Sequence, residues 1–74
     1  MTISTEEFRE AVTEFRTEER TVVVFFTLHA GAYRLAVDRD DFTTQLAAVA
    51  ASYKLRKPVT VLVRGLHIER VTGP

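Results

Sequence analysis

Apolar residues in the first part of the chain recur at the three- and four-residue spacing of an amphipathic helix. This first stripe consists of Phe8, Ala11, Val12 and Phe15. Ser4 stands shortly before the stripe and Glu7 follows it by three residues, which is the spacing of a helix capping box. We therefore expect a first helix that ends near Thr17.

A second helical stripe lies in the middle of the chain and begins with a similar sequence. Its apolar residues are Phe42, Leu46, Val49 and Tyr53. Asp38 is placed to cap the first turn, and Pro58 cannot continue a helix. We expect this second helix to end near Leu55.

Four segments rich in β-branched and aromatic residues predict strands, two after each expected helix. These segments are 21–28, 32–37, 59–64 and 66–71. Gly31 and Gly65 separate the members of each pair, as glycine often does in a hairpin. Alternation places Leu28 and Leu66 on the strand faces that should form the core with the helices.

These elements predict an α+β fold, a two-layer αββαββ sandwich with two helices on one face of a four-stranded antiparallel sheet. The whole chain, residues 1–74, would be a single domain. One αββ unit would span 3–37, a second would span 38–71, and a short C-terminal tail would follow at 72–74. The repeated order of elements suggests an internal duplication.

The face of this sheet that carries no helix has several apolar residues, although a sheet face in contact with water is normally polar. Val23, Phe25 and Leu62 fall on it, with Arg34 and Arg64 beside them. The first and third strands are the most apolar, so we favour the spatial order 2-1-3-4. The alternative, 1-2-4-3, would leave those two strands as exposed edges. We expect this face to be covered by a second copy of the chain or by another protein.

Length and composition exclude several classes of protein. A chain of 74 residues buries only about 60% of its unfolded surface, which leaves little room for a large active-site cleft. There is no cysteine, which excludes disulfides and thiolate metal sites. The longest apolar run, residues 22–26, is far shorter than a membrane span, and the N-terminus lacks the basic start of a signal peptide. We expect a cytoplasmic protein without membrane contact.

The 10 basic and 10 acidic residues are unevenly distributed. Residues 1–20 contain six glutamates and three arginines, whereas residues 21–74 contain seven basic and four acidic residues. Basic side chains around an aromatic ring on a sheet are typical of proteins that bind single-stranded nucleic acid. The candidate nucleic-acid contacts are Lys54, Arg56, Lys57 and His67, together with Arg34 and Arg64 on the sheet face.

Two groups of titratable residues are candidates for chemistry, and each has a simpler structural interpretation. Asp38, Asp40 and Asp41 could bind a divalent cation, but acidic residues at a helix start also compensate the helix dipole. His67 and Glu69 share one face of a strand, yet a metal site needs at least a third ligand. We therefore expect no enzyme, and no catalytic residue, metal, cofactor or small-molecule substrate.

The function that these observations favour is a small non-enzymatic protein-interaction module. It would self-associate, as a homodimer, or bind a protein partner through the helix-free sheet face. The predicted contact residues are Val23, Phe25, Leu62, Arg34 and Arg64. The alternative is a nucleic-acid-binding protein that uses the basic residues of the sheet face and of the 54–57 loop.

Overall fold

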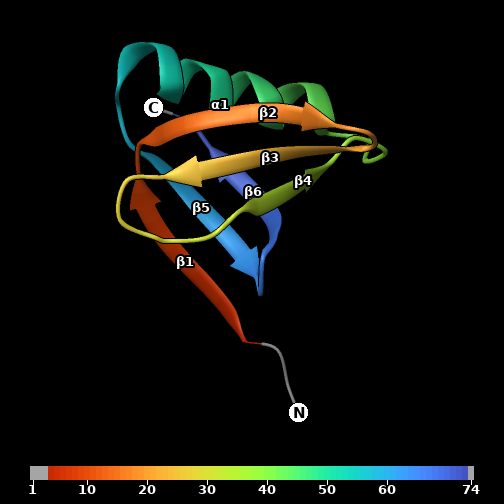
Figure 1. Ribbon diagram of the computed structural model, residues 1–74, viewed down its shortest axis with the longest axis horizontal. Helices are drawn as coiled ribbons and strands as arrows, with labels where there is room; N and C mark the ends of the chain where they lie inside the picture. Colours follow the sequence, from red (N-terminus) through yellow and green to blue (C-terminus); the bar gives the residue numbers. More distant parts are fainter. Residues whose placement is uncertain (1–3, 74) are drawn as a thin grey trace.

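The structure is a computed structural model that describes residues 4–73, and it contains one helix and a six-stranded mixed sheet over these residues (Figure 1). The elements are β1 (Thr5–Glu10), β2 (Val12–Glu18), β3 (Thr21–Phe26), β4 (Tyr33–Ala36), α1 (Phe42–Leu55), β5 (Val59–Arg64) and β6 (His67–Thr72). Their order across the sheet is β1-β5-β6-β4-β3-β2. All neighbours pair antiparallel except β4 and β6, which are parallel.

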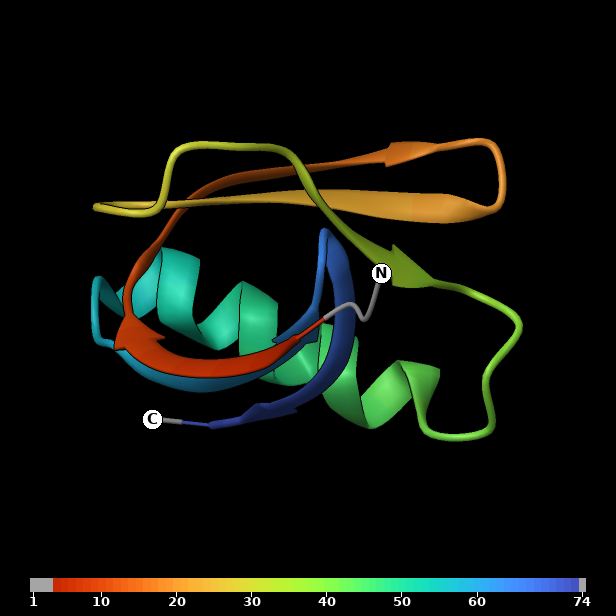
Figure 2. The same ribbon diagram turned by 90° about the horizontal axis from the view of Figure 1, so that it is seen from below.

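The sheet is strongly curled, so that its two halves face each other (Figure 2). One half contains β2, β3 and β4, and the other contains β1, β5 and β6. The halves are joined by the short parallel contact between Arg34 and His67, and by the chain, which passes from β1 to β2 through Ala11 and from β4 to β5 through α1. Helix α1 lies along the open side of the curl beside β2 and β6 (Figure 1).

The predicted first helix is wrong, because residues 5–18 form two strands, β1 and β2. Within β1 and β2 the buried and partly buried positions are Phe8, Glu10, Val12 and Phe15. Phe8, Glu10 and Val12 follow the two-residue period of a strand, and a β-bulge between Val12 and Glu14 then adds one residue. The resulting spacings of four and three between apolar residues imitate a helix.

The predicted sandwich of two helices on a four-stranded antiparallel sheet is therefore wrong as well, and so are the two αββ units and the internal repeat. The first unit begins with two strands, whereas the second begins with α1. The favoured strand order also fails, since the four predicted strands, now β3, β4, β5 and β6, have the alternative order 1-2-4-3. The edges of β3 and β5 that this order leaves open are covered by β2 and β1.

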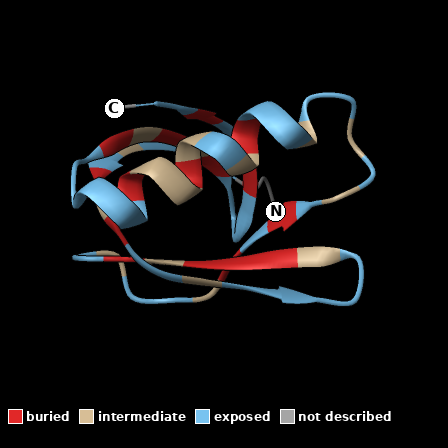
Figure 3. Cartoon of the chain, turned by 90° about the horizontal axis from the view of Figure 1, so that it is seen from above, coloured by how far each residue is buried: buried red, intermediate tan, exposed pale blue. Residues whose placement is uncertain are grey.

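One hydrophobic core lies inside the curl, where α1 faces the strands (Figure 3). Its buried members are Val12, Val22, Val24, Phe26, Tyr33, Leu35, Val49, Val59, Val61, Val63, Ile68 and Val71. Leu28 and Leu66 were predicted to join this core, but they are 85% and 50% exposed. Each lies in a connection just beyond the end of a strand, where the alternation of β3 and β5 no longer holds.

Helix α1 ends at Leu55 as predicted, and its C-cap residue Arg56 adopts a left-handed conformation with φ of 56°. Its N-cap is Asp41 and not Asp38, and the Asp41 side chain makes no capping hydrogen bond. The fully buried Ser52 ties the helix to the sheet, because its hydroxyl accepts from the Val12 N–H and donates to the Lys57 carbonyl. No helix within residues 4–73 is long and apolar enough to cross a membrane.

Candidate functional site

The predicted contact face does not form a continuous apolar surface. Val23 is only 2% exposed, between Arg16 on β2 and Arg34 on β4. Phe25 is partly buried, and the guanidinium of Arg16 lies 5.6 Å from the centre of its ring, within cation–π range. Leu62 lies on β5, in the other half of the curled sheet.

The homodimer predicted from this face is consequently not supported. That prediction required an open sheet with Val23, Phe25 and Leu62 side by side. The curl separates Leu62 from the other two, and neighbouring strands of the same chain already shelter Val23. The apolar driving force for self-association through this face is therefore small.

Three of the predicted residues do come together, at the junction between the two halves of the sheet. In the strand register His67 on β6 lies between Arg34 on β4 and Arg64 on β5. These three side chains line an open hollow of about 580 Å³. The hollow also contains Ala36, Arg39, Asp41, Ile68 and Glu69.

The second basic group, Lys54, Arg56 and Lys57, lies far from this hollow. It precedes the first residue of β5, whereas Arg64 is the last residue of that strand. The five steps from the first to the last residue of β5, at about 3.3 Å each, place the two groups at least roughly 16 Å apart along the strand. The basic surface predicted for nucleic acid is thus divided between two ends of the molecule.

A site that the sequence analysis did not predict lies at His29, in the loop between β3 and β4. Both ring nitrogens of His29 face carboxylates of β1: Nδ1 contacts Glu10, and Nε2 lies 3.2 Å from Oε2 of Glu6. The ring stacks on Phe8 with a centroid distance of 3.8 Å and an angle of 15° between the planes. Tyr33 lies on another side of the ring.

Glu10 is the buried member of this site, only 7% exposed. Its Oε1 accepts backbone N–H groups from Leu28, at 2.7 Å, and from His29, at 3.0 Å. Burial by itself raises the pKa of Glu10, but these two donors and the His29 ring outweigh burial, so that the pKa lies below its ordinary value. Hydrogen bonds to Glu10 and Glu6 raise the pKa of His29.

This arrangement favours the protonated form of His29. In that form both ring nitrogens donate to carboxylates, so neither is left as a free acceptor for a substrate proton, which a general base requires. Glu10 acts instead as a latch that holds residues 27–32 against β1, and we call this segment the latched loop. The sequence feature that could have indicated this site is Glu10, a charged residue at an inward-facing position between Phe8 and Val12.

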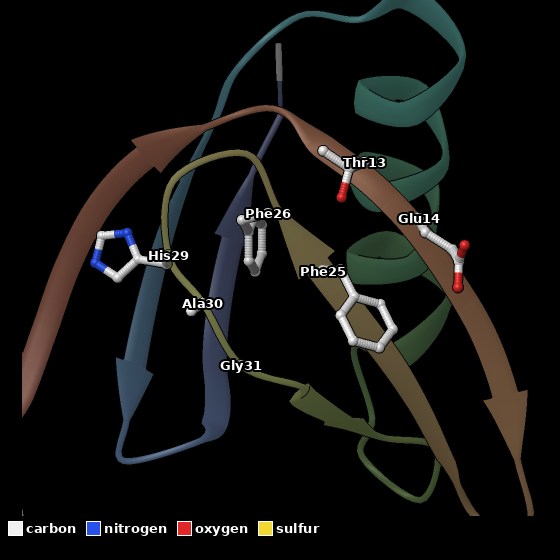
Figure 4. A pocket seen from close by; sticks show the side chains of 7 residues that line it. All are labelled: Thr13, Glu14, Phe25, Phe26, His29, Ala30 and Gly31. Carbon is white, nitrogen blue, oxygen red and sulfur yellow. The ribbon is translucent and has the colours of Figure 1, made fainter.

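The latched loop borders an open hollow of about 340 Å³ (Figure 4). In this view His29 points toward β1, and Phe25 points away from the core on the other side of the loop. The loop carries Leu28, which at 85% is the most exposed of the large hydrophobic residues between positions 4 and 73. Near the end of the loop Gly31 has φ of 130°, and the Leu66 side chain lies next to it.

One carboxylate of each candidate chemical group from the sequence lies beside an arginine. Asp41 pairs with Arg39, whose guanidinium lowers the pKa of that carboxyl. Glu69 lies 3.7 Å from Arg64, in the hollow that it shares with His67. Among residues 4–73 no three or more histidine, cysteine, aspartate or glutamate side chains are arranged to hold a metal ion.

Comparison with known proteins gives a structural likeness only. No protein-family model matches the sequence, and no curated protein matches it. The fold is similar to part of the crystal structure of pro-protein-glutaminase, with a TM-score of 0.82 over 95% of this chain. The identity is 16%, and the match covers 26% of that protein. At this identity the likeness shows the fold alone.

Proposed function

We propose that the chain is a small, non-enzymatic protein-binding module whose contact surface is the side of the sheet away from α1. The observation that carries this proposal is the display of Leu28, 85% exposed, on a loop whose backbone is fixed by the buried Glu10. The latched loop lies on the opposite side of β3 from α1 (Figures 1 and 2). A cytoplasmic location, expected from the sequence, is part of the proposal.

The energetics of the latch support a binding role. Burying a carboxylate is unfavourable unless hydrogen bonds compensate for the loss of water. Glu10 accepts these hydrogen bonds from the backbone of one surface loop. The result is a preorganised loop that presents an apolar side chain to solvent. Preorganisation lowers the entropic cost of association, and burial of one leucine contributes about 2 kcal/mol.

The chemistry of His29 supports the non-enzymatic part of the proposal. This imidazole uses both nitrogens to bridge Glu10 and Glu6, which is a structural use. In the structural neighbour, pro-protein-glutaminase, the matching fold is about a quarter of a longer chain. A fold that exists joined to further polypeptide is compatible with a module that packs against other protein.

The test is a photo-reactive amino acid placed at position 28 and expressed in the source cells. We expect one protein to be crosslinked from position 28 and not from the control position Leu55, which is 55% exposed at the end of α1. Excess wild-type chain should compete for this product, whereas excess Leu28→Ser chain should not. The proposal fails if position 28 gives no specific product, or if both competitors remove it equally.

A further inference from the structure

We propose that the row of Arg34, His67 and Arg64, here called the cationic row, binds a carboxylate side chain in an acidic segment of the partner protein. The proposal rests on the protein-binding function argued above, and it identifies the chemistry of the partner at a second place on the same molecule. The row crosses three adjacent strands, β4, β6 and β5, where the two halves of the sheet meet (Figure 1).

The strand register brings the three side chains together. His67 is the Cα partner of Arg34 on one side and of Arg64 on the other. Directly opposed residues on neighbouring strands lie about 5 Å apart, so the two arginines flank the histidine from backbone positions roughly 10 Å apart. Arginine side chains reach across such a span, and all three residues line the same hollow.

The positive charge of the cationic row is poorly compensated inside the chain. No ion pair to Arg34 forms within residues 4–73. Arg64 has only a 3.7 Å contact with Glu69, between side chains that are 61% and 47% exposed, and such surface pairs contribute little. Arg34 and Arg64 both carry a positive charge and flank His67, so an anion placed between them would be attracted by two guanidinium groups.

Arg39, the third arginine of the hollow, already has partners within the chain, so an incoming anion is left to Arg34 and Arg64. Arg39 pairs with Asp41 and also donates to the backbone carbonyls of Ile68 and Glu69. Its guanidinium therefore serves to hold the segment before α1 against β6. The groups left to meet a ligand are the two guanidinium forks of Arg34 and Arg64, whose planar geometry matches a carboxylate.

The surroundings favour one carboxylate over a nucleic-acid backbone. Arg34 also lines a neighbouring hollow together with Glu18, Glu19 and Arg20. Asp41 and Glu69 line the same hollow as the cationic row. A phosphate chain that followed the surface through Arg34 would pass these carboxylates, whereas a single acidic side chain needs only the space between the two arginines.

The inference can be tested with the full chain and a defined probe, an acetylated and amidated peptide that contains two adjacent glutamates. We expect saturable shifts of the Arg34 and Arg64 Nε–H signals in ¹⁵N NMR, and none with the matching glutamine peptide. Arg34→Gln should weaken binding about tenfold, the loss expected for one charge-assisted contact. Lys57→Gln removes the same charge at the far end of β5 and should change the affinity less than about twofold.

Four results would overturn the inference: no shift with the glutamate peptide, equal shifts with the glutamine peptide, equal affinity loss in Lys57→Gln, or tighter binding of a short oligothymidylate than of the glutamate peptide. The last result would assign the row to nucleic acid. Arg34 and Lys57 are exposed, so both variants should fold, and circular dichroism checks this. If crosslinking from position 28 succeeds while the peptide leaves the row unchanged, only this inference fails. If the peptide binds and position 28 finds no protein, the proposed function fails.

Discussion

Replacing Glu10 by alanine should unlatch the loop and destabilise the whole chain. The change removes the acceptor of two backbone N–H groups, those of Leu28 and His29. A hydrogen bond to a charged group contributes about 1.5–3 kcal/mol, and water can reach this loop in part, so we use the lower value for each bond. The expected loss is about 3 kcal/mol of the free energy of unfolding, a large share for a domain of this size.

Urea denaturation measures this loss, and Glu7→Ala supplies the control. Glu7 lies on the same strand but is exposed, so its replacement should change the free energy of unfolding by less than about 0.5 kcal/mol. Amide hydrogen exchange then locates the effect, because the Leu28 and His29 amides should lose protection in Glu10→Ala. The latch is refuted if the two variants are equally stable, or if these amides exchange at the wild-type rate.

Three further outcomes follow from the same contacts. Because the pKa of His29 is raised in the folded chain, the stability that His29 contributes is complete below about pH 6.5 and is lost as pH rises through that higher pKa. Because the pKa of Glu10 is lowered, the stability that Glu10 contributes is present above about pH 4.5 and is lost as pH falls through that lower pKa. Stability measured against pH should therefore fall on both sides of this window, and His29→Asn should abolish the alkaline fall. Ser52→Ala should cost about 1–3 kcal/mol in urea denaturation, since it leaves the buried Val12 N–H and the partly buried Lys57 carbonyl without this partner, and a cost under about 0.5 kcal/mol would contradict the bonds assigned to it. Gly31→Ala should cost about 1–3 kcal/mol, because φ of 130° is unfavourable for alanine and the new Cβ would touch Leu66; unchanged stability would contradict the backbone conformation described for the loop.

The C-terminal half of the fold could be predicted from the sequence because its elements are regular. The apolar residues Phe42, Leu46, Val49 and Tyr53 recur at helical spacing, and Pro58 follows the end of the helix by three residues. In β5, Val59, Val61 and Val63 alternate without interruption. Local pattern and tertiary structure agree there, so both propensity and periodicity point to the same elements.

The N-terminal half could not be predicted because its irregularities hide the strand period. Three features interrupt the alternation of polar and apolar residues: the bend at Ala11, the bulge after Val12 and the buried charge of Glu10. The glutamates of this segment also have a high helix propensity. Pairing with β3 and β5 outweighs this preference. The two sites depend on long-range structure in the same way. The proximity of Arg34 and Arg64 follows from the strand order, which the sequence analysis did not establish, and no local pattern linked Glu10 to His29.

The passage of the chain from β1 directly into β2 has a consequence for how the protein is made. Residues 12–36 contain β2, β3 and β4, which pair with one another and can begin to fold as soon as they leave the ribosome. The partner of β1 is β5, which is synthesised about fifty residues later. Until β5 has been made, β1 has no strand to pair with, and its charged side chains oppose aggregation of the nascent chain before this long-range pairing can form.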